Sequence, residues 1–356
     1  MNVAFFGSSQ NSLTVLKALR QAAFNIKLVV TAPPRPVGRK QILTKTPPHT
    51  FAEENGTPVF APEKLDKQFL QKFQATSLDV CIVADYARLI PKEVLDHPKH
   101  GCLNLHPSLL PKYCGSSPAE AAILNGDKVT GLSIIQMDEK FDHGPIVAQF
   151  EEEIYNNDTS ETLYQRLFSA GAKVLITILS AWVEGRIVPK DQNHPQATYA
   201  KRLTRDDGFI PWPLLRKATQ GEAFNPEQLN PRLRQVWEDS EQKGEANKFS
   251  PGATARQTAW LAKQKKGYVR SRTLATKKIS VGRAEFLERA IRAFYPWPGI
   301  WTIISSKSGK KRLKILSAHL EKWKMENGKW KMRLALDQVQ LEGKTPQKFE
   351  ENVLRR

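Results

Sequence analysis

The amino-acid sequence predicts a two-domain α/β protein, in which a mostly parallel, Rossmann-like sheet is followed by a small antiparallel β-barrel of the OB-like type. The length of 356 residues suits two domains of roughly 150 residues each. The first half alternates short apolar runs with helical patterns, as a parallel sheet requires. Beyond residue 300, short alternating runs are separated by glycine-containing turns, which is typical of antiparallel strands.

The first domain is expected to span residues 1–187. Short, continuous apolar runs predict buried strands at residues 3–6, 26–30, 80–84 and 102–105. Apolar residues at helical spacing predict helices near residues 13–19 and 65–73. A capping-box pattern, Asp158-Thr159-Ser160-Glu161, starts a long helix with apolar positions from Leu163 to Trp182, and this helix is expected to close the domain.

The second domain is expected to span residues 204–356, after a polar, proline-containing linker at residues 188–203. Residues 213–282 are rich in Gln, Lys, Asn and Pro and show little periodicity, which indicates an insertion. A short helix is predicted around residues 286–294. The barrel strands are expected at residues 301–304, 313–316 and 332–336.

Positive charge is concentrated in one part of the sequence. The formal net charge is +18, and the segment from Lys263 to Arg333 carries 20 Lys and Arg against four acidic residues. Aromatic residues are interleaved with this charge: Tyr268, Trp297, Trp301, Trp323 and Trp330. Because binding a polyanion releases counterions for each neutralised phosphate, the pattern favours contact with RNA or DNA over a merely solvated surface.

Several classes of protein are disfavoured by composition. Three cysteines, Cys81, Cys102 and Cys114, are too few for a disulfide framework, and no Cys/His set has zinc spacing, so we expect neither disulfides nor a metal. No apolar run approaches the roughly 18 residues that span a bilayer, and the first residues resemble a strand rather than a basic leader. We therefore expect a cytoplasmic protein without a membrane partner, and a monomer.

One stretch carries the chemistry. It runs Asn104-Leu105-His106-Pro107-Ser108-Leu109-Leu110-Pro111 and is followed by Asp142-His143-Gly144. Its polar residues come at the carboxyl end of a predicted parallel strand, where open α/β sheets bind ligands. Strand alternation puts Asn104 and His106 on the same side. Taken alone, a strand-end histidine is more often a structural residue than a catalytic one.

The segment from Gly101 to Pro118, together with Gln136-Met137-Asp138 and Asp142-His143-Gly144, resembles the methionyl-tRNA formyltransferase family of folate-dependent formyltransferases. Further matches are Arg35-Pro36-Val37-Gly38-Arg39, Ala197-Thr198-Tyr199-Ala200 and Pro296-Trp297-Pro298-Gly299. The resemblance covers most of the chain except residue 213 to about 283, where this sequence looks longer than the family. Because the C-terminal half also matches, the resemblance is to the branch that acts on tRNA.

The resemblance implies transfer of the formyl group of 10-formyltetrahydrofolate to the α-amino group of initiator methionyl-tRNA, for translation initiation. It places the catalytic residues at Asn104, His106 and Asp142. The Asn104 amide and a protonated His106 would stabilise the negative oxygen that develops during transfer. Asp142 would orient His106 and help to move the proton from the attacking amine.

The resemblance also implies binding residues. The folate would contact Ser108, Leu109, Leu110 and Pro111, and the strand-end loop with Ala84, Tyr86 and Leu89 would wall the pterin. Arg35, Arg39 and Lys40 would contact the acceptor end of the tRNA. The sequence departs from the family at Cys114, where an arginine is usual, and at Ala84-Asp85-Tyr86-Ala87, where Ala-Tyr-Gly is usual.

Two other functions stay open at this stage. The same chemistry could act on a small amine, such as an amino sugar or glycinamide ribonucleotide, although the basic C-terminal segment argues against it. The departures at Cys114 and Asp85 are also compatible with a tRNA-binding homologue whose catalysis is impaired.

Overall fold

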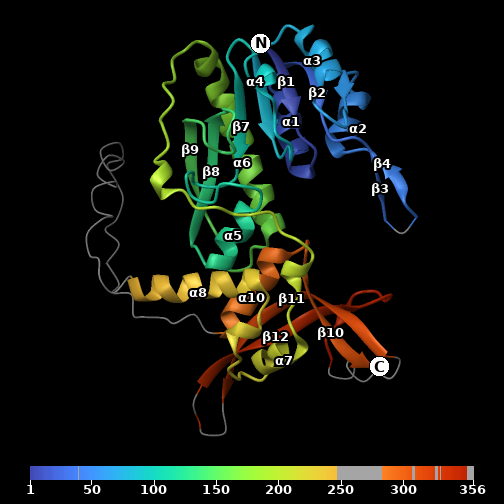
Figure 1. Cartoon of the computed structure of the whole chain (residues 1–356), viewed down its shortest axis with the longest axis vertical. Helices are drawn as coiled ribbons and strands as arrows, with labels where there is room; N and C mark the ends of the chain where they lie inside the picture. Colours follow the sequence, from blue (N-terminus) through green and yellow to red (C-terminus); the bar gives the residue numbers. More distant parts are fainter. Residues whose placement is uncertain (39, 247–282, 307–308, 325–327, 329, 351–356) are drawn as a thin grey trace. The chain divides into compact units, whose positions relative to one another are not determined.

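The structure, a computed structural model of the whole chain, describes all residues except 39, 247–282, 307–308, 325–327, 329 and 351–356. Arg39, one of the predicted tRNA contacts, therefore lies outside the described residues. The chain divides into two compact units, Met1–Leu203 and Thr204–Arg356 (Figure 1). We describe each unit by itself.

The first unit is built on a sheet of seven strands in the order β5-β2-β1-β6-β7-β8-β9. The neighbouring strands β5, β2, β1, β6 and β7 run parallel to one another. Strand β8 pairs antiparallel with β7, and β9 pairs antiparallel with β8. The sheet strands are β1 (Asn2–Phe6), β2 (Asn25–Val30), β5 (Val59–Phe60), β6 (Val80–Ala84), β7 (Cys102–His106), β8 (Val129–Gln136) and β9 (Ile146–Glu153). The four predicted buried strands thus lie in β1, β2, β6 and β7, which confirms the mostly parallel α/β fold.

Helices cover both faces of this sheet. Their bounds are α1 (Gln10–Gln21), α2 (Pro47–Glu54), α3 (Lys67–Gln74), α4 (Lys92–Leu95), α5 (Pro118–Asn125) and α6 (Ser160–Val183). On one face, Phe69 and Phe73 of α3 pack with Phe6, Leu28 and Val83 of the strands. On the other face, α1 packs against α6, and Gly171 of α6 lies against Leu132 of β8. The two predicted helices and the predicted long helix are confirmed as α1, α3 and α6.

Among the described helices, α6 is the one that is long and apolar enough to cross a membrane by length and composition. Its N-cap residue Thr159 accepts a hydrogen bond from the backbone of Thr162. Nine of its residues are buried in the first unit, Leu163 and Leu167 among them. The helix therefore has the environment of a core helix.

A two-stranded hairpin, β3 (Arg35–Val37) with β4 (Ile42–Thr44), extends from the first unit (Figure 1). Both of its strands are exposed along their whole length. This hairpin contains the Arg35-Pro36-Val37-Gly38-Arg39 stretch that resembles the family. Its exposed apolar residues, Val37, Ile42 and Leu43, leave a surface available for a partner.

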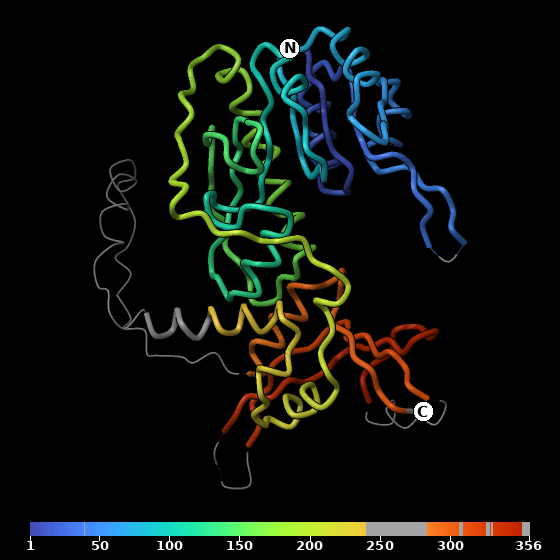
Figure 2. The backbone as a smooth tube through the Cα atoms, viewed as in Figure 1, coloured from blue at the N-terminus to red at the C-terminus, as the bar shows by residue number. Residues whose placement is uncertain are grey.

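The expected linker at residues 188–203 belongs to the first unit (Figure 2, yellow-green). Lys190 pairs with Ile146 through two backbone hydrogen bonds of 2.8 Å. Further along, Cys114 donates its N–H to the Thr198 carbonyl at 2.8 Å, and Ala200 donates its N–H to the Cys114 carbonyl at 2.7 Å. The segment is polar because most of its side chains are exposed, while its backbone completes the loop after β7.

The second unit contains an antiparallel sheet in the order β10-β11-β12-β13. Its elements are α7 (Trp212–Thr219), α8 (Pro231–Ala246), α10 (Arg283–Phe294), β10 (Ile300–Ser306), β11 (Gly309–Lys324), β12 (Trp330–Leu341) and β13 (Gln347–Lys348). Short 3-10 turns lie at His194–Gln196 in the first unit and at Asp206–Gly208 and Pro226–Gln228 in this one. The predicted helix lies in α10 and the three predicted strands in β10 to β12. In the described residues this sheet is a meander with β10 and β13 at its edges.

The start of the expected insertion is helical. Residues 213–246 form α7 and α8, and Leu214, Leu215, Leu233 and Trp237 are buried in the second unit. Trp237 packs edge-to-face on Phe286 of α10 at a centroid distance of 5.2 Å. The sparse apolar residues of this stretch thus build a core face, whereas residues 247–282 of the expected insertion lie outside the described part.

Candidate active site

His106, the last residue of β7, is buried and has an acceptor beside each ring nitrogen. Nε2 lies 3.0 Å from the backbone carbonyl of Tyr113, and Nδ1 lies 3.3 Å from Oδ1 of Asp142. The Tyr113 carbonyl and an ionised carboxylate both only accept, so each ring nitrogen has a partner for an N–H. This pair of acceptors suits the cationic ring, and the two groups together fix the orientation of the imidazole.

Asp142 reaches His106 from the loop between β8 and β9. Its backbone is left-handed, with φ of +53°, a conformation that non-glycine residues seldom adopt. Its other carboxylate oxygen, Oδ2, accepts the N–H of Gly115 at 2.7 Å. Gly115 has φ of +107°, and a Cβ added there would lie 2.7 Å from the Ala200 carbonyl oxygen. Glycine is therefore required at residue 115 for its N–H to reach the carboxylate.

The charge of Asp142 is held in place by its surroundings. Burial alone would raise the pKa of Asp142, but the nearby His106 and the Gly115 N–H outweigh it and lower this pKa below its ordinary value. Cys114 lies close by, and burial together with the Asp142 charge raises the pKa of its thiol. The site thus combines an ionised carboxylate, an imidazole and a protonated thiol.

Asn104 lies two residues before His106 on β7, between Val83 of β6 and Ile135 of β8. The residue is half-buried, and its side-chain amide has no hydrogen-bonding partner among the described residues. Alternation along the strand puts it on the same side as His106, as predicted. Its amide is therefore free to donate to a ligand at the carboxyl end of β7.

The predicted folate stretch, residues 108–111, is a tightly held loop. The Ser108 hydroxyl donates to the Lys112 carbonyl at 2.6 Å. Ser133 and Gln149 take up the backbone of Leu110, since Ser133 Oγ accepts its N–H at 3.1 Å and Gln149 Nε2 donates to its carbonyl at 3.1 Å. The hydroxyl and the Leu110 backbone thus serve the loop itself, so the loop offers a ligand mainly its shape and apolar side chains.

The other predicted folate residues follow β6. Ala84 is fully buried, and Tyr86 packs edge-to-face on Phe6 at a centroid distance of 5.4 Å. Leu89 is 58% exposed. Asp85, which lies between Ala84 and Tyr86, is exposed and has φ of +49°. Its carbonyl accepts the Ser8 N–H at 3.3 Å. Tyr86 thus contributes to the core, and Leu89 is the side chain of this set that can meet a ligand.

The predicted tRNA contacts lie apart from this cluster, on the exposed hairpin. Arg35 lies 4.0 Å from Glu63, and Lys40 is exposed. Lys112 lies two residues before Cys114, where the family usually has an arginine. Its Nζ is paired with Asp127 at 2.7 Å. The cation at residue 112 is therefore already neutralised within the first unit.

The second unit carries cations over aromatic rings. Arg312 lies over Trp301 at 4.7 Å, and Arg333 lies over Trp323 at 4.1 Å. Trp297 and Trp330 are 55% and 65% exposed. Exposed rings among Lys and Arg side chains are the combination that stacks on bases and neutralises phosphates.

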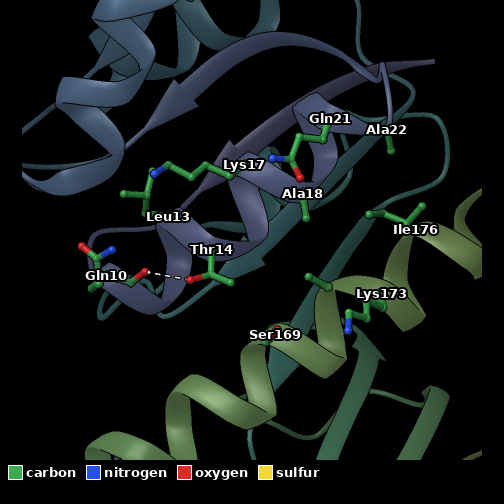
Figure 3. A pocket seen from close by; sticks show the side chains of 11 residues that line it. Gln10, Leu13, Thr14, Lys17, Ala18, Gln21, Ala22, Ser169, Lys173 and Ile176 are labelled. Carbon is green, nitrogen blue, oxygen red and sulfur yellow. Dashed lines mark hydrogen bonds between the residues drawn. The ribbon is translucent and has the colours of Figure 1, made fainter.

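A separate surface pocket of about 540 Å³ lies between α1 and α6 (Figure 3). Lys17, Thr14, Ser169 and Lys173 are among its lining residues, and none of the predicted site residues is. Thr14 Oγ1 donates to the Gln10 carbonyl at 3.3 Å within α1. The pocket is therefore distinct from the His106 cluster.

Sequence reasoning missed several groups of the site. The Tyr113 carbonyl acts through the backbone, which leaves no residue-type signal, whereas the signal for the Gly115 N–H is the glycine itself. Gln192 is buried in the segment predicted as a linker, and its amide donates to the carbonyls of Asp142 and Gly144. A lone glutamine in a polar stretch gives no signal that could have found it.

Comparison with known proteins shows the family to which the chain belongs. The profile of the Formyl transferase family matches residues 1–179, and that of the Formyl transferase C-terminal domain matches residues 281–341. A methionyl-tRNA formyltransferase of Thermodesulfovibrio yellowstonii is 41% identical over 211 residues, 59% of this chain and 68% of that protein. One of Bacillus mycoides is 38% identical over 213 residues, 60% of this chain and 68% of that protein. A sugar 3N-formyl transferase, solved in the presence of dTDP and 5-N-formyl-THF, covers 97% of this chain and 99% of its own at 14% identity, with a TM-score of 0.54. This last likeness concerns the fold.

Proposed function

The chain belongs to the Formyl transferase family, and on this premise we propose that it transfers a formyl group from 10-formyltetrahydrofolate to the α-amino group of initiator methionyl-tRNA. The observation that carries the proposal is the His106 ring held between the Asp142 carboxylate and the Tyr113 carbonyl, two residues after Asn104. The proposal includes a cytoplasmic location and action as a monomer.

Each residue of the cluster has one role in this reaction. The acceptor amine attacks the formyl carbon, so a C–N bond forms and the formyl oxygen gains negative charge. The Asn104 amide and the cationic His106 ring stabilise that oxygen. Asp142 accepts a proton from the attacking amine, directly or through water. The oxygen then re-forms the C=O bond as the C–N bond to the folate nitrogen breaks, and the proton held by Asp142 passes to that leaving nitrogen, directly or through water.

The binding residues likewise have separate roles, some for the folate and others for the tRNA. We propose that the folate lies against Leu109, Leu110 and Pro111 and against the exposed Leu89. The hairpin with Arg35 and Lys40, and with Arg39 outside the described residues, would receive the acceptor end of the tRNA. The aromatic and basic side chains of the second unit, such as Trp297 and Trp330, support contact with the rest of the tRNA.

The test is formylation by the full chain with 10-formyltetrahydrofolate and three acceptors: methionyl-initiator tRNA, methionyl-elongator tRNA and a small amine. We expect transfer to the initiator tRNA, lost in an Asn104→Ala, His106→Ala double variant. Transfer to the small amine alone would replace the proposed acceptor. Salt-sensitive tRNA binding without turnover on any amine would mean that the chain binds tRNA without catalysis.

A further inference from the structure

Gln192 is the buried polar side chain that joins the segment 188–203 to the loop carrying Asp142. It is 7% exposed, while the flanking Asp191 and Asn193 are exposed. Its Nε2 donates to the Asp142 carbonyl at 2.8 Å and to the Gly144 carbonyl at 2.7 Å. One amide thus holds the backbone on both sides of His143.

The orientation of this amide follows from its partners. Both neighbours are carbonyl oxygens, so the NH₂ end must face them. Its Oε1 is buried without a hydrogen-bonding partner among the described residues. A buried, unpaired oxygen costs free energy. The contribution of this side chain therefore comes from the two hydrogen bonds that its NH₂ group donates.

The bonded loop is also the one that aims the Asp142 carboxylate. Asp142 is in the left-handed region, and a Cβ on Gly144 would lie 1.8 Å from the Gln136 carbonyl oxygen. The Gln136 carbonyl thus crowds the turn at Gly144, and the Gln192 amide bonds to the backbone of the same turn. A shift of the Asp142 backbone would move the carboxylate away from His106.

We propose that Gln192 is a positioning residue of the formyl-transfer site, which sets the direction of the Asp142 carboxylate through the backbone of Asp142 and Gly144. The inference rests on the proposed function. The titratable groups that face Asp142 are His106 and Cys114. The adjacent His143 has its Nδ1 2.7 Å from a carboxylate oxygen of Asp138, and its ring is stacked on His194 at a centroid distance of 3.7 Å.

The first test uses Gln192→Leu in the full chain, which keeps the approximate size of the side chain and removes its donors. We expect kcat for formylation to fall about 10- to 100-fold, with both KM values within about 2-fold, because losing a hydrogen bond that orients a functional group typically costs this much. The control is Gln196→Leu, a change of the same kind at an exposed residue of the same segment, which should stay within about 2-fold of the wild type in kcat. A Gln192→Leu variant with wild-type kcat would overturn the proposal.

The second test uses Gln192→Glu, whose carboxyl can donate only while it is protonated. The kcat of this variant relative to the wild type should therefore rise as the pH is lowered. A ratio that does not change with pH would contradict the proposed role, since a merely structural loss would not follow protonation.

The third test needs no acceptor. The titration of the Asp142 carboxyl is followed by ¹³C NMR, with its signal assigned by its absence in Asp142→Asn. In Gln192→Leu the pKa of Asp142 should rise toward its ordinary value, because the carboxylate loses contact with His106 and Gly115. An unchanged titration would refute the inference, even if the wild type formylates no tRNA and the proposed function has failed.

Discussion

Replacement of Asp142 by asparagine tests the central ion pair of the site. The change keeps the size of the side chain and removes its charge, which lies 3.3 Å from Nδ1 of His106. At an effective dielectric constant of about 20, two unit charges at this distance interact by about 5 kcal/mol. That energy corresponds to nearly four powers of ten in rate, at about 1.4 kcal/mol for each power.

The full interaction is an upper limit, because the asparagine oxygen can still accept the Gly115 N–H and one end of the amide still faces His106. We therefore expect kcat to fall about 10²- to 10⁴-fold, with KM for both substrates changed by no more than about 3-fold, as for an interaction that strengthens in the transition state. The assay is steady-state formylation of charged initiator tRNA at several pH values. The control is Asp138→Asn, which removes a partly exposed carboxylate from the same loop and should retain nearly full activity.

A kcat for Asp142→Asn within about 3-fold of the wild type would refute the assignment of Asp142 as a charged catalytic group. Equal losses in both aspartate variants would instead point to a general electrostatic effect of the loop. Either result would contradict the reasoning from the 3.3 Å pair.

Three other changes test separate parts of the chain. Gly115→Ala should lower kcat at least about 10-fold, because φ of +107° and the nearby Ala200 carbonyl oppose a Cβ, whereas Gly56→Ala, with positive φ in open space, should keep full activity and lose only about 1 kcal/mol of stability. Asp158→Asn should lower the free energy of unfolding by about 1 to 3 kcal/mol at pH 7, measured by urea denaturation, because the buried carboxylate is bonded to Arg166 at 2.7 Å. Burial opposes ionisation of Asp158, but the bonds from Arg166, Tyr155 and Thr162 lower its pKa. The carboxylate therefore stabilises the fold above the unfolded pKa near 4, and the stability difference between the wild type and Asp158→Asn should shrink as the pH falls below that value. A stability difference that stays constant with pH would exclude the Asp158 charge as its source. Finally, log K for tRNA binding should fall by roughly 0.7 to 0.9 per contacted phosphate for each log unit of salt, and a flat response would exclude the basic segment as the binding surface.

The parallel sheet could be predicted because its strands are continuous apolar runs, buried on both faces. The same runs place Asn104 and His106 at a strand end, and the resemblance then adds Asp142. The distance between His106 and Asp142 could not be predicted, because it depends on a left-handed turn at an aspartate and on the absence of a side chain at Gly115.

Two features escaped prediction for different physical reasons. The segment 188–203 joins the first unit through backbone hydrogen bonds, which any residue type can make, so its polar composition resembled a linker. In residues 213–246, buried residues such as Leu233 and Trp237 do recur at helical spacing, but they are few among many polar residues, so the pattern is weak and tertiary packing stabilises the helices. Tyr86 illustrates a third limit, since a tyrosine after a strand suits a pocket wall and a core equally well.

The attachment of residues 188–203 to the first unit also determines where this gene can be cut and joined. A hybrid protein that takes its front half from this chain and its tail from a relative should be spliced after Leu203, where the compact unit ends. A junction placed at the end of α6 would exchange the stretch that holds the turn around Asp142. In such a hybrid, residues of the relative would hold the turn that carries the Asp142 carboxylate.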